Sequence, residues 1–113
     1  MVKYSHDGLS RTFSALADPT RRAILLRLAS QADLSVSELA HPFPIKLPAV
    51  LKHVDVLCDS GLVIRNKIGR TVHCRLAPQG LLRAERWLER TSSFWKGRLD
   101  SLDDVLEAGR GRR

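Results

Sequence analysis

The chain has 113 residues and a formal net charge of +7, from 19 lysines and arginines against 12 aspartates and glutamates. Its 43% hydrophobic and 27% charged residues are typical of one globular domain. It has no apolar run of about 18 residues, which a membrane helix needs, and residues 1–10 lack the apolar stretch of a secretory signal. Two cysteines are too few for a disulfide scaffold. We therefore expect a cytoplasmic protein with no membrane partner.

Helical periodicity predicts three helices in the first half of the chain, over residues 9–17, 19–30 and 35–41, after a flexible N-terminus at 1–8. The first helix ends at Asp18-Pro19, because the residue before a proline avoids the helical region. Ser35 and Glu38 have the spacing of a capping box, in which each side chain bonds the other residue's backbone N–H. That pair predicts the start of the third helix.

A fourth helix and a hairpin follow. Val50, Val54 and Leu57 recur at i, i+4 and i+7, which predicts a helix over 47–60 with a buried face. Gly61 suits the left-handed residue that follows a helix. Two segments rich in β-branched residues then predict a hairpin over 62–76, with a turn at 68–70. The predicted fold is mainly α with a small β-hairpin, a winged helix-turn-helix.

Positive charge concentrates in this helix and hairpin. Residues 44–76 contain six lysines and arginines against two aspartates. A basic patch on a helix that fits the major groove is typical of a protein that reads double-stranded DNA. We predict that the helix residues enter the major groove and that the hairpin residues lie near the DNA backbone. The helix residues are Lys46, Pro48, Ala49, Lys52 and His53, and the hairpin residues are Arg65, Lys67 and Arg70.

The C-terminal segment predicts a long helix over 78–107, followed by a flexible basic tail at 108–113. Its apolar stripe is too long for one small domain to cover, so a second copy of the chain is expected to pack against it. The alternative is that the helix only caps its own domain. The predicted dimer interface consists of Leu9, Phe13, Leu16, Leu81, Leu88, Trp95, Leu99, Leu102 and Leu106.

The ordered motifs resemble those of the ArsR family of bacterial repressors over residues 9–107. They are residues 13–25 (FSALADPTRRAIL), Ser37-Glu38-Leu39-Ala40, Leu47-Pro48-Ala49-Val50, Lys52-His53, Leu57 and Gly61-Leu62-Val63. The resemblance implies a homodimeric, sequence-specific transcriptional repressor whose fourth helix enters the major groove. Lys46 and Leu51 depart from the family pattern, which has hydroxyl residues there. Leu51 can offer a base only an apolar contact, for example with a thymine methyl.

The ligands of the family's metal sensors are missing from this sequence. Residues 36–40 of the third helix contain no cysteine, and the last helix has Glu85 and Glu89 but no histidine. We predict no metal and no cofactor. No glycine-rich phosphate loop, inward carboxylate pair or nucleophile beside a base is visible, so we also predict that the protein is not an enzyme.

Two alternative functions remain open: a winged helix that docks proteins, and a redox-responsive repressor that uses Cys58 and Cys74. An unknown effector is a further expected partner.

Overall fold

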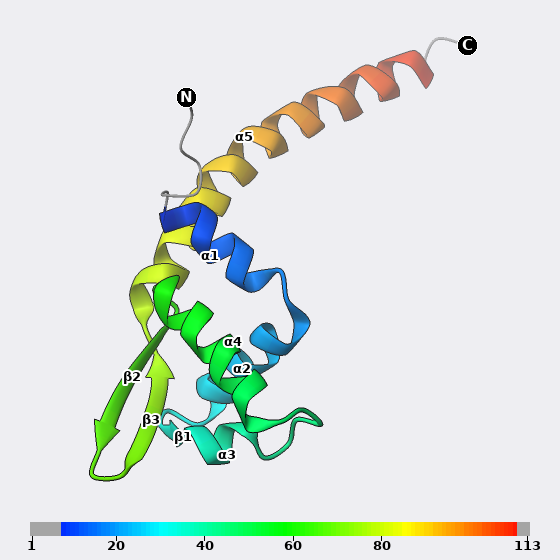
Figure 1. Cartoon of the computed structure of the whole chain (residues 1–113). Coiled ribbons are helices and arrows are strands. Elements are labelled where there is room, and N and C mark those ends of the chain that lie inside the picture. The colour runs from blue at the N-terminus through cyan, green and yellow to red at the C-terminus, as the bar shows by residue number, and fades with distance from the viewer. Residues whose placement is uncertain (1–7, 111–113) are drawn as a thin grey trace, which may run out of the picture.

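The computed structural model describes residues 8–110. Within that part of the chain, five helices and three strands follow one another (Figure 1). They are α1 (Gly8–Leu16), α2 (Pro19–Ser30), β1 (Leu34–Ser35), α3 (Val36–Ala40), α4 (Leu47–Asp59), β2 (Val63–Ile68), β3 (Thr71–Leu76) and α5 (Pro78–Arg110). The predicted winged helix-turn-helix is confirmed, with all five helices in their expected order.

The predicted boundaries need correction at both ends of the domain. Helix α1 begins at Gly8, and α5 continues to Arg110 instead of ending at residue 107. Residues 108–110 therefore extend the helix, where the sequence predicted a tail. Residues 108–113 are charged and rich in glycine and have no apolar periodicity. The continuation of α5 to Arg110 was therefore not visible in the sequence. The remaining terminal predictions, for residues 1–7 and 111–113, lie outside the described residues.

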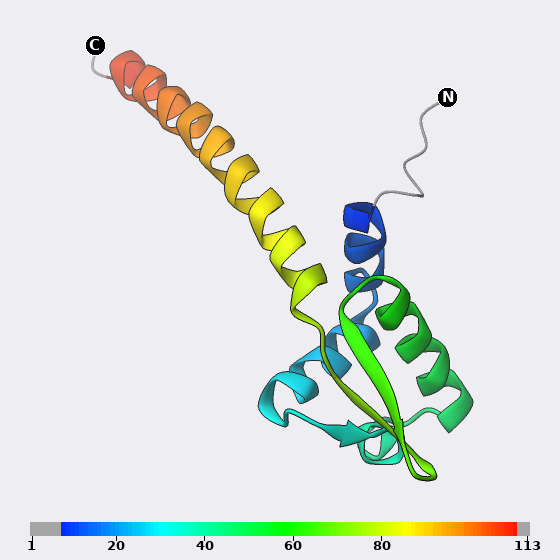
Figure 2. The ribbon, with the colours of Figure 1, turned by 90° about the vertical axis from the view of Figure 1, so that its left-hand side faces the viewer.

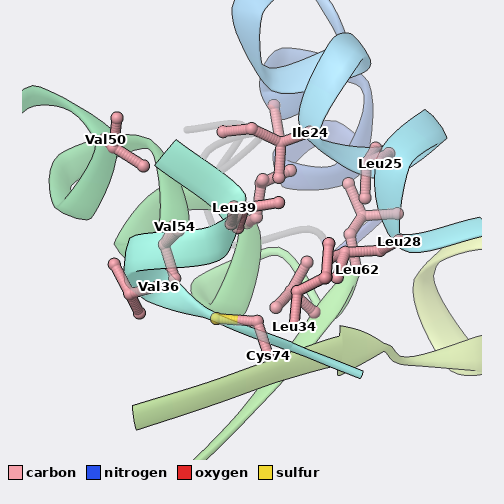
Figure 3. Packing of buried hydrophobic residues seen from close by; sticks show 13 residues of the cluster. Ile24, Leu25, Leu28, Leu34, Val36, Leu39, Val50, Val54, Leu62 and Cys74 are labelled. Atoms are coloured by element: carbon pink, nitrogen blue, oxygen red, sulfur yellow. The ribbon is translucent and has the colours of Figure 1, made fainter. Parts of the chain in front are cut away.

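The core lies between α2, α3, α4 and the sheet (Figure 3). Val50, Val54 and Leu57 of α4 are fully buried, as their spacing predicted. They pack with Ile24 of α2 and Leu39 of α3, which are also fully buried. The predicted capping box of α3 is present as well. Burial of one face therefore fixes which face of α4 is left for solvent.

The sheet has three strands in the order β1-β3-β2, where the sequence predicted a hairpin alone. Strand β1 pairs antiparallel with β3, with Leu34 opposite Cys74 and Ser35 opposite His73. Two residues are too few to show strand periodicity, which is why β1 was missed. At the other end of β3, Gly69 has a positive φ of 62° and turns the chain between β2 and β3.

Hydrogen bonds to two backbone carbonyls tie α1 and α5 to the end of α4. The Thr12 hydroxyl of α1 lies 3.0 Å from the carbonyl oxygen of Ser60. The backbone N–H of Gly80 in α5 donates to the carbonyl of Gly61 at 2.9 Å. Gly61 itself has a φ of +76°, a conformation that favours glycine. The residues that end α4 are thus held from two sides.

Helix α5 makes the molecule long. The body and α5 together measure 73 × 37 × 22 Å, with a radius of gyration of 19.8 Å. A compact chain of this length has a radius of gyration of about 13 Å. Figure 2 shows the reason: α5 leaves the body beside α1 and continues well past it. Among residues 8–110, no helix is both long and apolar enough to cross a membrane.

Candidate nucleic-acid interface

The solvent face of α4 is centred on Pro48, Leu51, Lys52 and Asp55, which are all exposed. This face is opposite the buried stripe, because α4 places residues four apart on the same side. Pro48 sits in the first turn, and Lys46 precedes the helix without a capping side-chain bond. The N-terminal half of α4 and the hairpin tip lie at the same end of the molecule, away from the distal part of α5 (Figure 1). This is the arrangement that a groove-reading helix with a flanking wing requires.

Two predicted groove residues lie at the side of that face. Ala49 is half-buried, and the His53 side chain is only 23% exposed. His53 Nδ1 lies 3.5 Å from Arg21 Nη1 and 3.8 Å from Asp18 Oδ2. His53 therefore packs against the start of α2, and this contact turns its Nδ1 toward the protein. Leu51 is better placed on the exposed face than either of them.

Asp18 and Arg21 form a cluster that the sequence reasoning missed. Asp18 caps α2 by accepting a bond from the Arg21 backbone N–H at 3.0 Å. That bond holds the pKa of the Asp18 carboxyl below its ordinary value, and the nearby His53 lowers it further. The Arg21 side chain donates to the carbonyl oxygens of Ala15 at 2.7 Å and Ser14 at 3.1 Å. An aspartate directly before a proline is a signal for a helix start that was available in the sequence.

The hairpin carries the remaining predicted contacts. Lys67 and Arg70 are exposed on β2 and in the turn. Arg65 differs from them, because its Nη1 pairs with Oδ1 of Asp55 on α4. This hydrogen bond raises the pKa of the Arg65 guanidinium and compensates its charge. Lys67 and Arg70 are therefore the free cations among the three predicted wing residues, and Arg65 links the wing to α4.

The two thiols do not have the properties of a redox pair. Cys74 is fully buried on β3, and Cys58 is half-buried near the end of α4. Burial raises the pKa of Cys74 to about 11 and also raises the pKa of Cys58. The thiolate is the reactive form of cysteine, so both groups are held in their unreactive form at neutral pH. This argues against the redox alternative.

Metal ligands do not gather anywhere between residues 8 and 110. No group of three histidine, cysteine, aspartate or glutamate side chains there has the arrangement to hold an ion. His73 Nδ1 lies 3.0 Å from Asp33 Oδ1, and this pair joins β3 to the turn before β1. Cys74 is buried on the other side of the strand. His73 and Cys74 therefore face different surroundings on opposite sides of β3.

The predicted dimer residues fall into two groups. Leu9, Phe13 and Leu16 are half-buried on α1, where the Phe13 ring stands 5.5 Å from Trp87 of α5 at 71°. The α5 members are exposed in the protomer; they are Leu81, Leu88, Trp95, Leu99, Leu102 and Leu106. Helix α1 thus covers one side of α5 near its start. It leaves the long apolar stripe uncovered by its own chain.

Proteins with similar sequences include transcriptional regulators and repressors. A family model described as a helix-turn-helix domain matches residues 16–65. The chain is 38% identical over 98 residues to the HTH-type transcriptional regulator Rv2034 of Mycobacterium tuberculosis, covering 87% of this chain and 88% of the relative. It is also 38% identical over 66 residues to the arsenical resistance operon repressor of Escherichia coli, covering 58% of this chain and 56% of that protein.

Solved structures give the same picture. The crystal structure of an ArsR family transcriptional regulator is 41% identical, with a TM-score of 0.74 over 85% of this chain and 97% of the other. The homodimeric winged helix-turn-helix DNA-binding domain of a Mycobacterium bovis protein is 25% identical, with a TM-score of 0.62 over 77% of this chain and 80% of the other. These two structures match 85% and 77% of this chain, more than the residues 16–65 that the helix-turn-helix model matches.

Proposed function

Because this chain belongs to the ArsR family of winged helix-turn-helix transcriptional regulators, we propose that it is a homodimeric repressor that reads an inverted-repeat operator. The observation that carries the proposal is the exposed face of α4, which stands at the same end of the molecule as the basic hairpin tip. A regulator of this kind acts in the cytoplasm and has no catalytic task. Repression follows from occupancy, because a dimer bound at a promoter blocks access to it.

The proposed DNA-contacting surface has two parts, one for the bases and one for the phosphates. In the proposed complex, Pro48, Leu51 and Lys52 of α4 face the base edges in the major groove. Leu51 supplies an apolar contact that suits a thymine methyl, and Lys52 suits the acceptors of a guanine. Lys67 and Arg70 of the wing meet the phosphates of the flanking backbone, which supply most of the affinity that does not depend on sequence.

The dimer sets the spacing of the operator. With the apolar stripe of α5 packed against a second copy, two α4 helices are related by a two-fold axis. Two reading helices that enter successive major grooves on one side of the duplex lie about 34 Å apart. The operator is therefore expected to be an inverted repeat whose half-site centres are separated by one helical turn.

Fluorescence anisotropy with DNA from upstream of the protein's own gene tests the proposal, with scrambled DNA as the comparison and several salt concentrations. We expect Lys52→Ala to cost about 1–3 kcal/mol of specific binding, and Arg70→Ala to reduce the salt slope by about 1. Arg90→Ala is the matched control, because Arg90 is an exposed cation on α5 far from the reading end. It should bind like the wild type.

Two outcomes would contradict the assignment. Unchanged affinity in both Lys52→Ala and Arg70→Ala would remove the reading surface from α4 and the wing. The second outcome is equal and weak binding to the upstream DNA and to scrambled DNA. If DNA recovered from cells by genome-wide binding is also bound no better than scrambled DNA, the winged helix is favoured as a protein-docking module.

A further inference from the structure

An ion pair joins the exposed face of α4 to strand β2 of the wing. Nη1 of Arg65 donates a hydrogen bond to Oδ1 of Asp55, and the two side chains are 39% and 56% exposed. Asp55 follows Lys52 by three residues on the face of α4 that we expect to meet the bases. Ion pairs as exposed as this one add little to folding stability. What the two charges would do at a DNA surface is therefore the more informative question.

Arg65 lies where the inner face of the wing leaves the core. It is directly opposite the fully buried Cys74 of β3, and residues opposite each other in a sheet place their side chains on the same face. Val63 and Lys67 share this face, because alternate residues of a strand point to the same side. Lys67 is about 7 Å farther toward the hairpin tip, at about 3.4 Å per residue. Arg65 thus stands between the core and an unpaired cation of the wing.

Each charge of the pair would act on DNA if its partner were missing. The Arg65 guanidinium would join Lys67 and Arg70 as an unpaired cation, able to bind the phosphates of any sequence. The Asp55 carboxylate would repel phosphates, and it could also pair with Lys52, since residues three apart on a helix are neighbours. The hydrogen bond between the two side chains removes both effects. It also links the face of β2 that carries Lys67 to α4.

We propose that the Asp55–Arg65 ion pair is a specificity-determining element of the DNA-contacting surface. It withholds one cation of each subunit from the phosphates that every duplex offers, and it keeps Lys52 free for a base. Because specificity is a difference between two affinities, limiting the sequence-independent affinity raises it. The inference rests on the proposed function and adds how binding to other sequences is kept weak.

Two other roles of these residues lead to different predictions. If Arg65 bound a phosphate in spite of its partner, that contact would already contribute to the salt dependence of the wild type. If Asp55 accepted a hydrogen bond from the amino group of a cytosine, its removal would matter only for duplexes that contain that base pair. Variants that remove one charge at a time distinguish these roles from the proposed one.

Fluorescence anisotropy at several salt concentrations tests the proposal. The probes are a duplex that the wild-type protein selects from a random-sequence library and a scrambled duplex of the same composition. Asp55→Asn keeps the shape of the side chain but releases Arg65. We expect tighter binding of the scrambled duplex, a smaller ratio of the two affinities, and a salt slope steeper by about 0.9 for each new phosphate contact. Each such contact makes the affinity fall about 3.5-fold further between about 50 and 200 mM salt.

Three variants that change Arg65 complete the set. Arg65→Gln leaves the Asp55 carboxylate without its partner, so we expect weaker binding of both duplexes and a salt slope no steeper than that of the wild type. The D55N/R65Q variant lacks both charges, and its slope should return to the wild-type value because the intact pair has no net charge. The D55R/R65D variant restores the ion pair in reverse and should recover most of the wild-type affinity ratio.

Asp59→Asn is the matched control. Asp59 is the other acid of α4, is exposed, and forms no ion pair with a residue between positions 8 and 110. Its replacement changes the net charge as much as Asp55→Asn does but releases no arginine. The affinity ratio and the salt slope should therefore stay at the wild-type values. Far-UV circular dichroism should show the same helical content for every variant.

Three results would overturn the proposal. An unchanged salt slope in Asp55→Asn would do so, and a shallower slope in D55N/R65Q would then show that Arg65 already binds a phosphate. A loss of affinity in Asp55→Asn that is confined to the selected duplex would make Asp55 a base contact. Equal effects of Asp55→Asn and Asp59→Asn would reduce the pair to net charge.

Failure of the proposed function gives a separate result. A wild-type protein that selects no duplex from the library would contradict a sequence-specific repressor. The salt slopes measured with scrambled DNA would still show whether Arg65 is withheld from phosphates, because that measurement needs no operator.

Discussion

Gly80→Ala tests the junction between α4 and α5. A Cβ atom at Gly80 would stand 2.6 Å from the carbonyl oxygen of Gly61 and 2.8 Å from its carbonyl carbon. Both are backbone atoms, so no flexible side chain can move aside. Ordinary contact begins at 3.4 Å, and reaching it requires a shift of 0.8 Å, the difference between 3.4 and 2.6 Å. Such a shift would break the 2.9 Å bond from the Gly80 N–H to the Gly61 carbonyl.

The expected magnitude combines three effects. Overpacking a tight contact costs about 1–3 kcal/mol, and loss of the backbone hydrogen bond adds about 1 kcal/mol. Alanine in place of a helical glycine returns about 1 kcal/mol. The net loss in the free energy of unfolding is therefore about 1–3 kcal/mol. For a chain of this size that lowers the melting temperature by roughly 4–12 °C.

Thermal unfolding followed by circular dichroism measures this change, with every variant at the same protomer concentration because dimerisation contributes to stability. Gly97→Ala is the matched control in the same helix, since a Cβ there has no atom within 4 Å. We expect it to leave the melting temperature unchanged or to raise it, by at most about 1 kcal/mol of helix propensity. A Gly80→Ala variant that melts at or above the wild-type temperature would refute the close approach of α5 to Gly61.

Two further predictions concern neighbouring contacts. Thr12→Val keeps the shape of a fully buried side chain but removes a hydroxyl that lies 3.0 Å from the carbonyl oxygens of both Ser60 and Gly8 and donates its one proton to this pair. The change should cost about 1–2 kcal/mol in urea unfolding, and an unchanged midpoint would contradict a stabilising hydrogen bond from this hydroxyl. Asp18 has a lowered native pKa, chiefly because of the Arg21 N–H. Its charge therefore stabilises the fold above the unfolded pKa of about 3.9, and this contribution is lost as pH falls through the native value. Melting temperatures of wild type and Asp18→Asn should differ at pH 7, and the difference should shrink as the pH falls below about 4; a constant difference would refute the linkage.

Local periodicity predicted most of the fold. The buried face of α4 followed from Val50, Val54 and Leu57, because a helix that packs on a core repeats its apolar residues every three or four positions. Gly61 and Gly69 marked the ends of α4 and β2, since both positions need a positive φ. These features depend on neighbours in the sequence, and they were therefore visible in it.

Contacts between distant segments were not visible. His53 is held by Asp18, which caps α2, and by Arg21 in its first turn, so its side chain is less available to DNA than its position in the recognition helix suggested. Arg65 is paired with Asp55 for the same kind of reason, because β2 folds back beside α4. A count of cations along the chain cannot separate a paired arginine from a free one. The structure thus shifts the expected DNA contacts toward Lys52, Lys67 and Arg70.

The junction connects the predicted dimer surface to the helix that is predicted to contact DNA. Thr12 and Gly80 belong to the two helices that carry the predicted dimer surface, and both bond to the carbonyls of Ser60 and Gly61 at the end of α4. We therefore expect a change in the angle between α1 and α5 to be passed to the end of α4 through these contacts. Since affinity for an inverted repeat depends on the separation of two α4 helices, we expect the packing of α5 against its partner and the affinity for DNA to be coupled through these two bonds.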